Sequence, residues 1–163
     1  MKAGRVAYYG LFAALAVLMG YVELLVPVPV PIPGVKLGLA NVVIIVMLYY
    51  MDAKSAFFIS LIRVILCGLL FAGFAGLLYS LSGALLSFAA MALLKKTGQF
   101  SIVGVSIAGG VFHNVGQIVV AALAVENVKM AYYLPFLLVS GVVTGLLIGL
   151  AAQTALRYLK AKP

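Results

Sequence analysis

The sequence predicts an all-α integral membrane protein, a bundle of six transmembrane helices in a single domain over residues 1–163. Hydrophobic residues make up 66% of the chain and charged residues 9%, whereas a soluble domain carries about 25% charge. The apolar residues come in runs of about 20, the length that crosses a bilayer as a helix. Most lysines and arginines lie at the ends of those runs, where they do not have to enter the hydrocarbon.

The predicted spans cover most of the chain. They are residues 7–26, 35–51, 53–76, 77–94, 100–125 and 132–159. The strictly apolar part of the second span, residues 37–51, is short, which predicts a tilted or partly buried helix. The others have the roughly 17 to 25 residues that a crossing needs.

Positive charge predicts the orientation, because cytoplasmic segments carry an excess of lysine and arginine. With the N-terminus inside, the outer connections hold only Lys36 and Lys129. An even number of spans then places the C-terminus inside as well. The net charge of +8 does not indicate a nucleic-acid partner, because no basic face is interleaved with exposed aromatic residues. The cytoplasmic ends collect Lys2, Arg5, Lys54, Lys95, Lys96, Arg157, Lys160 and Lys162.

The connection over residues 27–34 alternates proline with apolar residues up to a final glycine. This pattern blocks helix formation and favours an extended segment of polyproline type. Two interpretations stay open at this point: a spacer between the first two spans, or a lid over an outward-facing pocket.

Polar side chains inside the predicted spans are the candidate ligand-binding residues, because such groups are costly in lipid and mark functional sites. At about 1.5 Å per residue, Arg63 lies roughly 15 Å from the cytoplasmic side, near the midplane. His113 lies about 20 Å in on the same scale. These residues predict one polar cluster open to the outside. The full set is Glu23, Asn41, Arg63, His113, Asn114 and Gln117.

The two ionisable groups deepest in the membrane each have a structural and a functional interpretation. A lone Arg63 costs about 2.5 to 3.5 kcal/mol near the bilayer centre on insertion scales. It either pairs with Glu23 or backbone carbonyls and locks helices together, or it faces the negatively charged part of a ligand. His113 is either a neutral imidazole bonded to a neighbouring helix, or a group that relays protons or contacts a ligand.

Small residues form two stripes at helical spacing, which let another helix approach closely. The last span carries Gly141, Gly145 and Gly149, in a GxxxGxxxG pattern. This stripe either packs within the chain or meets a partner. The beginning of the chain carries a second stripe that has the same two interpretations: Ala3, Ala7, Gly10 and Ala14.

Several kinds of chemistry lack the residues they need. The chain has no GxxxxGK[ST] phosphate loop, so it cannot hydrolyse ATP by that route. The only aspartate, Asp52, lies at a membrane edge, so paired carboxylates for magnesium-diphosphate chemistry are missing. One histidine and one cysteine on different helices do not make a metal site. We therefore expect a protein that is not an enzyme and carries no cofactor or metal.

Five stretches carry a resemblance to a known family. They are residues 33–41 (PGVKLGLAN), 61–64 (LIRV), 80–87 (SLSGALLS), 109–117 (GGVFHNVGQ) and 133–135 (YLP). The chain resembles, over nearly its whole length, the bacterial membrane family labelled heptaprenyl diphosphate synthase component I, also called the Gx transporter family. The His-Asn-x-x-Gln segment is the most specific part. This family looks like the substrate-binding S components of energy-coupling factor (ECF) vitamin transporters, which are also small six-helix proteins.

The resemblance implies an ECF S-component-like fold in the bacterial cytoplasmic membrane, with a pocket that opens outward. It also implies an energising module made of other chains, a coupling protein and ATPases, on which the first-span stripe of small residues would dock. Family members look like components of gene clusters for flavin-based extracellular electron transfer. The implied ligand is therefore related to an isoprenoid, a quinone, a flavin or a vitamin.

The leading hypothesis is an S-component-like protein that binds a small or amphipathic solute for uptake. Arg63 would neutralise ligand charge, and the amides of Asn114 and Gln117 would fix the ligand's orientation. The rival hypothesis is a non-catalytic membrane subunit of an isoprenoid-synthesis or extracellular electron transfer assembly. A self-contained channel is disfavoured, because the sequence has no acidic rings or pore-lining repeat.

Overall fold

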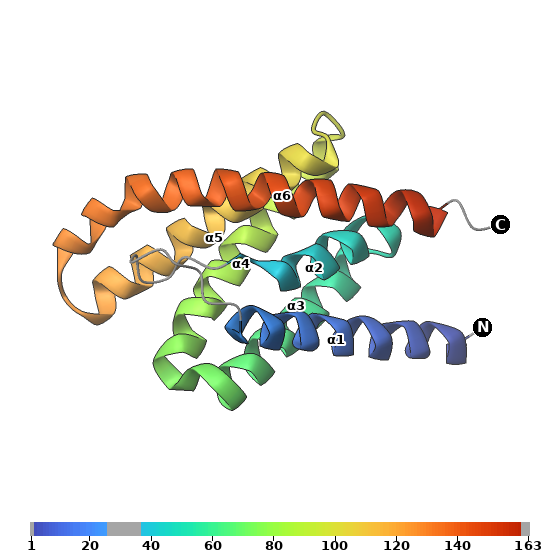
Figure 1. Ribbon diagram of the computed structural model, residues 1–163, viewed down its shortest axis with the longest axis horizontal. Coiled ribbons are helices and arrows are strands. Elements are labelled where there is room, and N and C mark those ends of the chain that lie inside the picture. The colour runs from blue at the N-terminus through green and yellow to red at the C-terminus, as the bar shows by residue number, and fades with distance from the viewer. Residues whose placement is uncertain (1, 26–36, 161–163) are drawn as a thin grey trace.

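The computed structural model describes residues 2–25 and 37–160, and within these ranges the protein is helical with no strand. The predicted proline segment, residues 27–34, lies outside the described residues. Figure 1 shows α1 and α6 running along the long axis of the molecule, with α4 crossing it obliquely between them. The elements are α1 (Lys2–Leu25), α2 (Leu39–Tyr50), α3 (Ala53–Cys67), the π-helix η1 (Gly68–Ala72), α4 (Gly73–Thr97), α5 (Ile102–Ala124), the 3-10 helix η2 (Val128–Tyr133) and α6 (Leu134–Lys160).

Four helical stretches in the described part of the chain are long and apolar enough to cross a membrane. They are Val6–Glu23, Ala53–Thr97, Ile102–Ala124 and Lys129–Lys160. The predicted count of six spans is not reached on this criterion, for two reasons. The helix α2 has 12 residues, or about 18 Å, against a hydrocarbon core of about 30 Å. In addition, α3, η1 and α4 follow one another without a polar break.

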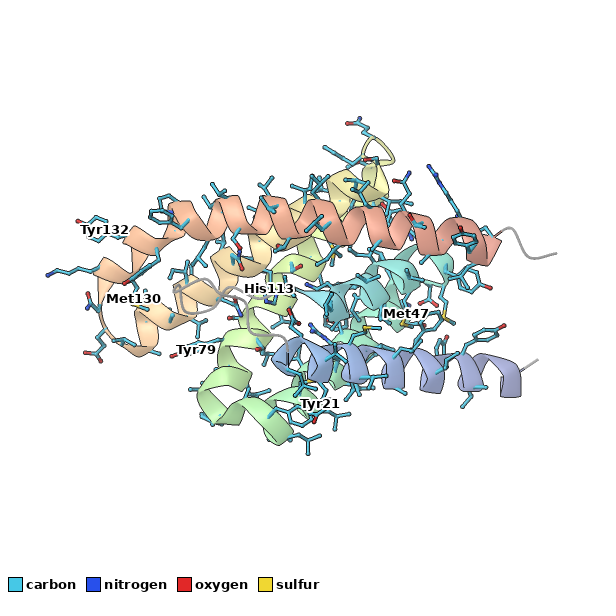
Figure 2. All side chains as sticks on the ribbon, in the orientation of Figure 1. Tyr21, Met47, Tyr79, His113, Met130 and Tyr132 are labelled. Atoms are coloured by element: carbon cyan, nitrogen blue, oxygen red, sulfur yellow. The ribbon has the colours of Figure 1, made fainter. Side chains whose placement is uncertain are left out.

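The short helix α2 forms the centre of the core. It contacts α1, α3 and α6, and Ile44, Met47 and Leu48 are almost completely buried. On the other side of the molecule α5 packs between α4 and α6. Figure 2 shows Met47 inside the bundle and Tyr132 projecting from its surface. Large apolar side chains cover that surface, which is the property of a protein that contacts lipid.

The glycine stripe of α6 is used inside the chain, against α5. A Cβ atom on Gly141 would lie 2.8 Å from the carbonyl oxygen of Gly110, and one on Gly145 would lie 2.7 Å from the Cα of Ile107. Gly149 likewise meets the α5 backbone. The two helices approach so closely because these positions have no side chain.

The small-residue stripe of α1 has a different environment. Ala7, Gly10 and Ala14 are exposed, and a Cβ atom on Gly10 would have no atom within 4 Å. The side chain of Ala3 is outside the described part of the structure. The opposite face of α1 carries buried residues such as Phe12, so the stripe faces away from the core.

Side chains cap the C-terminal end of α2 and the N-terminal end of α3. Lys95 of α4 donates a hydrogen bond to the Leu48 carbonyl in the last turn of α2, and its Nζ lies 5.1 Å from the centroid of the Tyr49 ring. A cation at this position complements the negative end of the α2 dipole. Asp52 caps α3 by accepting from the Ser55 N–H at 2.8 Å.

Candidate ligand-binding cavity

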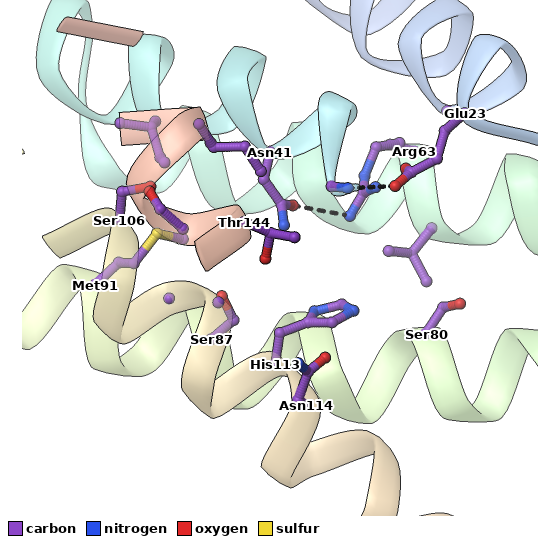
Figure 3. Close-up of a pocket in the computed structure, with 18 of the residues that line it drawn as sticks. Glu23, Asn41, Arg63, Ser80, Ser87, Met91, Ser106, His113, Asn114 and Thr144 are labelled. Atoms are coloured by element: carbon purple, nitrogen blue, oxygen red, sulfur yellow. Dashed lines mark hydrogen bonds between the residues drawn. The ribbon is translucent and has the colours of Figure 1, made fainter. Parts of the chain in front are cut away.

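A polar cavity of about 80 Å³ lies inside the bundle. Each helix from α1 to α6 contributes at least one side chain to its wall. Figure 3 shows Arg63 above the cavity and His113 on its opposite side. The polar residues of the wall are Glu23, Asn41, Arg63, Ser80, Ser87, Ser106, His113, Asn114 and Thr144.

Arg63 carries most of the hydrogen-bonding capacity of this wall. Its Nη2 donates to Oδ1 of Asn41 at 3.4 Å, which is a long contact. Its Nε is buried and has no hydrogen-bond partner among the described residues. A guanidinium is a planar group with several N–H donors and no acceptor. It can therefore take further bonds from a group that enters the cavity.

Glu23 supplies a negative charge that acts on Arg63. Its carboxylate accepts a hydrogen bond from the backbone N–H of Gly38, as Figure 3 shows. The carboxylate therefore holds the beginning of α2 against the end of α1. The charge of Arg63 is offset, while its Nε keeps its capacity to bind an acceptor.

Gly38 explains why α2 begins beside the cavity. Its φ of 75° lies in the left-handed region, which residues with a Cβ atom rarely adopt. A Cβ atom there would also lie 2.8 Å from Cδ1 of Ile148 on α6. This conformation starts the helix inside the bundle and brings Asn41, in its first turn, to Arg63. The N-terminal end of a helix carries partial positive charge, so the wall favours an anion here.

The His-Asn-x-x-Gln segment of α5 is divided between the cavity and helix packing. His113 and Asn114 both line the cavity, but the Asn114 Nδ2 donates to the Leu137 carbonyl of α6 at 2.6 Å. Gln117 is buried outside the cavity wall, with its Cγ 3.0 Å from where a Cβ atom on Gly83 of α4 would be. Its structural surroundings are thus those of a packing residue between α4 and α5.

Hydroxyl groups of the wall were not among the predicted site residues. Ser106 donates to the Gly145 carbonyl at 2.7 Å, and Thr144 donates to the Ser140 carbonyl at 2.9 Å. Each hydroxyl oxygen can still accept a bond from a ligand. The one available sequence signal was the seven-residue spacing of Ser80 and Ser87, which puts both on one face of a helix.

The donor set of the cavity does not suit a metal ion. Among the described residues no group of three or more histidine, cysteine, aspartate or glutamate side chains comes together. The chemistry offered by this wall is that of an arginine, a carboxylate, amides, hydroxyls and an imidazole around a small volume.

A family model described as heptaprenyl diphosphate synthase component I matches residues 12–155. The chain belongs to this family. The assignment predicted from five short stretches is therefore confirmed. Every residue of the cavity wall lies within the matched range. The name of the family, which describes one component of a synthase, implies a partner subunit. No curated protein and no solved structure shows significant similarity to the chain.

Proposed function

We propose that this protein binds a small or amphipathic solute with a negatively charged group in the cavity, in the manner of an S component. A separate ATP-driven module, made of a coupling protein and ATPases, would drive the uptake of the bound solute. The observation that carries the proposal is the buried Nε of Arg63, which has no bonding partner among the described residues although it lines a cavity.

The energetics of the membrane support a ligand at this position. An arginine inside a bilayer is costly and is typical of a binding site or ion pathway. Its planar fork of donors matches a carboxylate or a phosphate, and such charge-assisted bonds are about twice as strong as neutral ones. Asn41 and Glu23 would hold the guanidinium and the beginning of α2 in position, and His113 would contact the solute from α5.

The proposal includes six crossings of a bacterial cytoplasmic membrane, with both ends of the chain in the cytoplasm. A straight helix over the 45 residues of Ala53–Thr97 would be about 68 Å long, more than twice the hydrocarbon thickness of about 30 Å. The chain reverses near Gly73, where φ is 68°. Figure 1 shows the beginning of α1 and the end of α6 at the same end of the molecule, which supports an even number of crossings.

Native mass spectrometry of protein extracted from its own membranes tests the ligand site. The wild-type protein is expected to retain a small molecule, and Arg63→Gln is expected to lose it while staying monodisperse. The matched control is Arg157→Gln, which removes an exposed arginine at the end of α6 and should retain the molecule. An Arg63→Gln protein that keeps the same bound mass would overturn the proposal.

A second candidate function is that of a non-catalytic membrane subunit of an isoprenoid-synthesis or extracellular electron transfer assembly. The family name favours it, because that name describes one component of a synthase. Co-purification separates the two candidates. A coupling protein with two ATPases would support uptake, whereas a prenyl synthase or a flavoprotein would support the assembly subunit.

A further inference from the structure

A second hollow lies on the surface of the protein, between α1 and the α3–η1 segment. This groove has a volume of about 550 Å³ and an almost entirely apolar wall. Ala14, Leu18 and Tyr21 line it on α1, and Leu66 and Phe71 line it on the other side. The rings of Tyr21 and Phe71 are 5.2 Å apart between centroids, so the two walls meet at one end.

The groove and the polar cavity lie back to back. At three places along the chain, one residue lines the cavity and its neighbour in sequence lines the groove. These pairs are Gly20 and Tyr21, Cys67 and Leu66, and Ala72 and Phe71. In each pair the first residue lines the cavity and the second lines the groove. The residues on the cavity side are all small. The partition between the two hollows is therefore one residue thick, and at Gly20 a Cβ atom would lie 2.9 Å from the sulfur of Cys67.

The two volumes indicate how a ligand would be divided between them. Sites for small organic ligands measure about 300 to 1,000 Å³. The cavity, at about 80 Å³, holds a head group or a few water molecules at roughly 10 to 15 Å³ each. The groove has the volume of a hydrocarbon chain and no polar wall to exclude one. The π-helix η1 lies at the partition, and such segments are frequent at functional sites.

We propose that the ligand is a single-chain amphiphile whose anionic head, a phosphate or a carboxylate, binds Arg63 while its hydrocarbon chain passes between α1 and η1 into the groove. This inference rests on the proposed function and specifies its substrate class. The ligand enters sideways from the lipid, because the groove opens on the apolar face of the molecule. Gly20 has no side chain and Ala72 has only a methyl group, so neither would obstruct the chain once α1 separates slightly from η1.

Cys67 gives a direct readout, because it is the one cysteine of the chain and lies in the partition. The probes are dodecyl phosphate and ethyl phosphate, which share a head group and differ in chain length. Protection of Cys67 from N-ethylmaleimide is measured by intact mass on the full chain in nanodiscs. Ala14→Trp fills the groove. Ala7→Trp is the control, since Ala7 is equally exposed two turns away on the same face of α1.

The expected result is that dodecyl phosphate protects the wild-type protein and Ala7→Trp at the same concentration, and that Ala14→Trp needs at least tenfold more. Ethyl phosphate should protect all three equally, at higher concentration. If Ala14→Trp does not fold, Leu18→Trp obstructs the same groove. Dodecanoate in place of dodecyl phosphate distinguishes a carboxylate head from a phosphate.

The two proposals fail in different ways. Equal protection by dodecyl phosphate in Ala14→Trp and Ala7→Trp would overturn the placement of the chain in the groove. Unchanged protection by both probes in Arg63→Gln would overturn the proposed function instead. A wild-type protein that neither probe protects would overturn both.

Discussion

At the scale of single residues, a charge in an apolar run was easy to recognise, but its partners were not. Arg63 stands out in the sequence because no other arginine or lysine lies so deep in a predicted span. Its contact with Asn41 and the bond from Gly38 to Glu23 depend on where α2 begins. That position follows from one left-handed glycine, which the proline-rich sequence around it does not reveal.

The predicted polar residues of α5 illustrate a second limit. The spacing of His113 and Gln117 correctly implies adjacent turns of one helix. Because α5 is packed between α4 and α6, a shift of one turn takes a side chain out of the cavity wall. His113 and Gln117 both lie close to Gly83, but only His113 lines the cavity. Serine and threonine gave almost no sequence signal for the site. Their hydroxyls can donate hydrogen bonds to helix carbonyls, so their presence in a helix does not by itself indicate a ligand.

Gly38→Ala tests the role of this glycine. The substitution places a Cβ atom in a left-handed conformation, at a cost of about 1 to 2 kcal/mol, and against Ile148 as well. Gly98→Ala is the matched control, because its φ is 69° but no atom lies within 4 Å of the new Cβ. We expect the lower thermal stability, and the weaker ligand retention, for Gly38→Ala. Equal melting temperatures would contradict the contact with α6.

At the scale of elements, the two stripes of small residues diverge. Sequence spacing alone could not separate them, because both stripes have the three- or four-residue spacing of one helix face and only their neighbours differ. The α6 stripe lies against the backbone of α5, and the α1 stripe lies on an exposed face. We predict that Gly145→Val disrupts folding, because overpacking a close helix contact costs about 1 to 3 kcal/mol or more.

Gly10→Val is the counterpart on α1 and should keep the stability of the wild-type protein. If the α1 face docks a coupling protein, this variant should lose that partner in co-purification while its melting temperature stays unchanged. A strong loss of stability in Gly10→Val would mean that the α1 stripe is covered within the protein itself.

Lys95 of α4 caps the C-terminal end of the short helix α2, and we expect the stability of α2 to depend on it. A hydrogen bond that involves a charged group contributes about 1.5 to 3 kcal/mol. We expect Lys95→Met to lower the melting temperature, because it removes the bond to the Leu48 carbonyl. The neighbouring Lys96 is exposed, so Lys96→Met should leave stability unchanged. The same melting temperature in both variants would contradict the capping role.

At the scale of the whole molecule, composition was enough to predict an all-helical membrane protein. The predicted spans rest on the length of each apolar run, which the bilayer thickness sets. The count of crossings could not be settled in the same way. A buried 12-residue helix and a continuous apolar stretch from α3 to α4 have the same composition as spans but different geometry.

Site-directed labelling tests the orientation in cells. In a Cys67→Ser background, a cysteine at position 129, in η2, should react with a membrane-impermeant thiol reagent added outside. A cysteine at position 54, at the beginning of α3, should react only after the membrane is permeabilised. The reverse pattern would contradict the placement of both ends of the chain in the cytoplasm.

The central claim is that Arg63 keeps a buried donor for a ligand in a cavity formed by α1 to α6. The most direct test is an experimental structure of the protein extracted from its own membranes. The account predicts additional density in the cavity with an acceptor atom about 3 Å from the Nε of Arg63. An empty cavity in which the guanidinium is bonded throughout to Glu23 or to backbone carbonyls would contradict it.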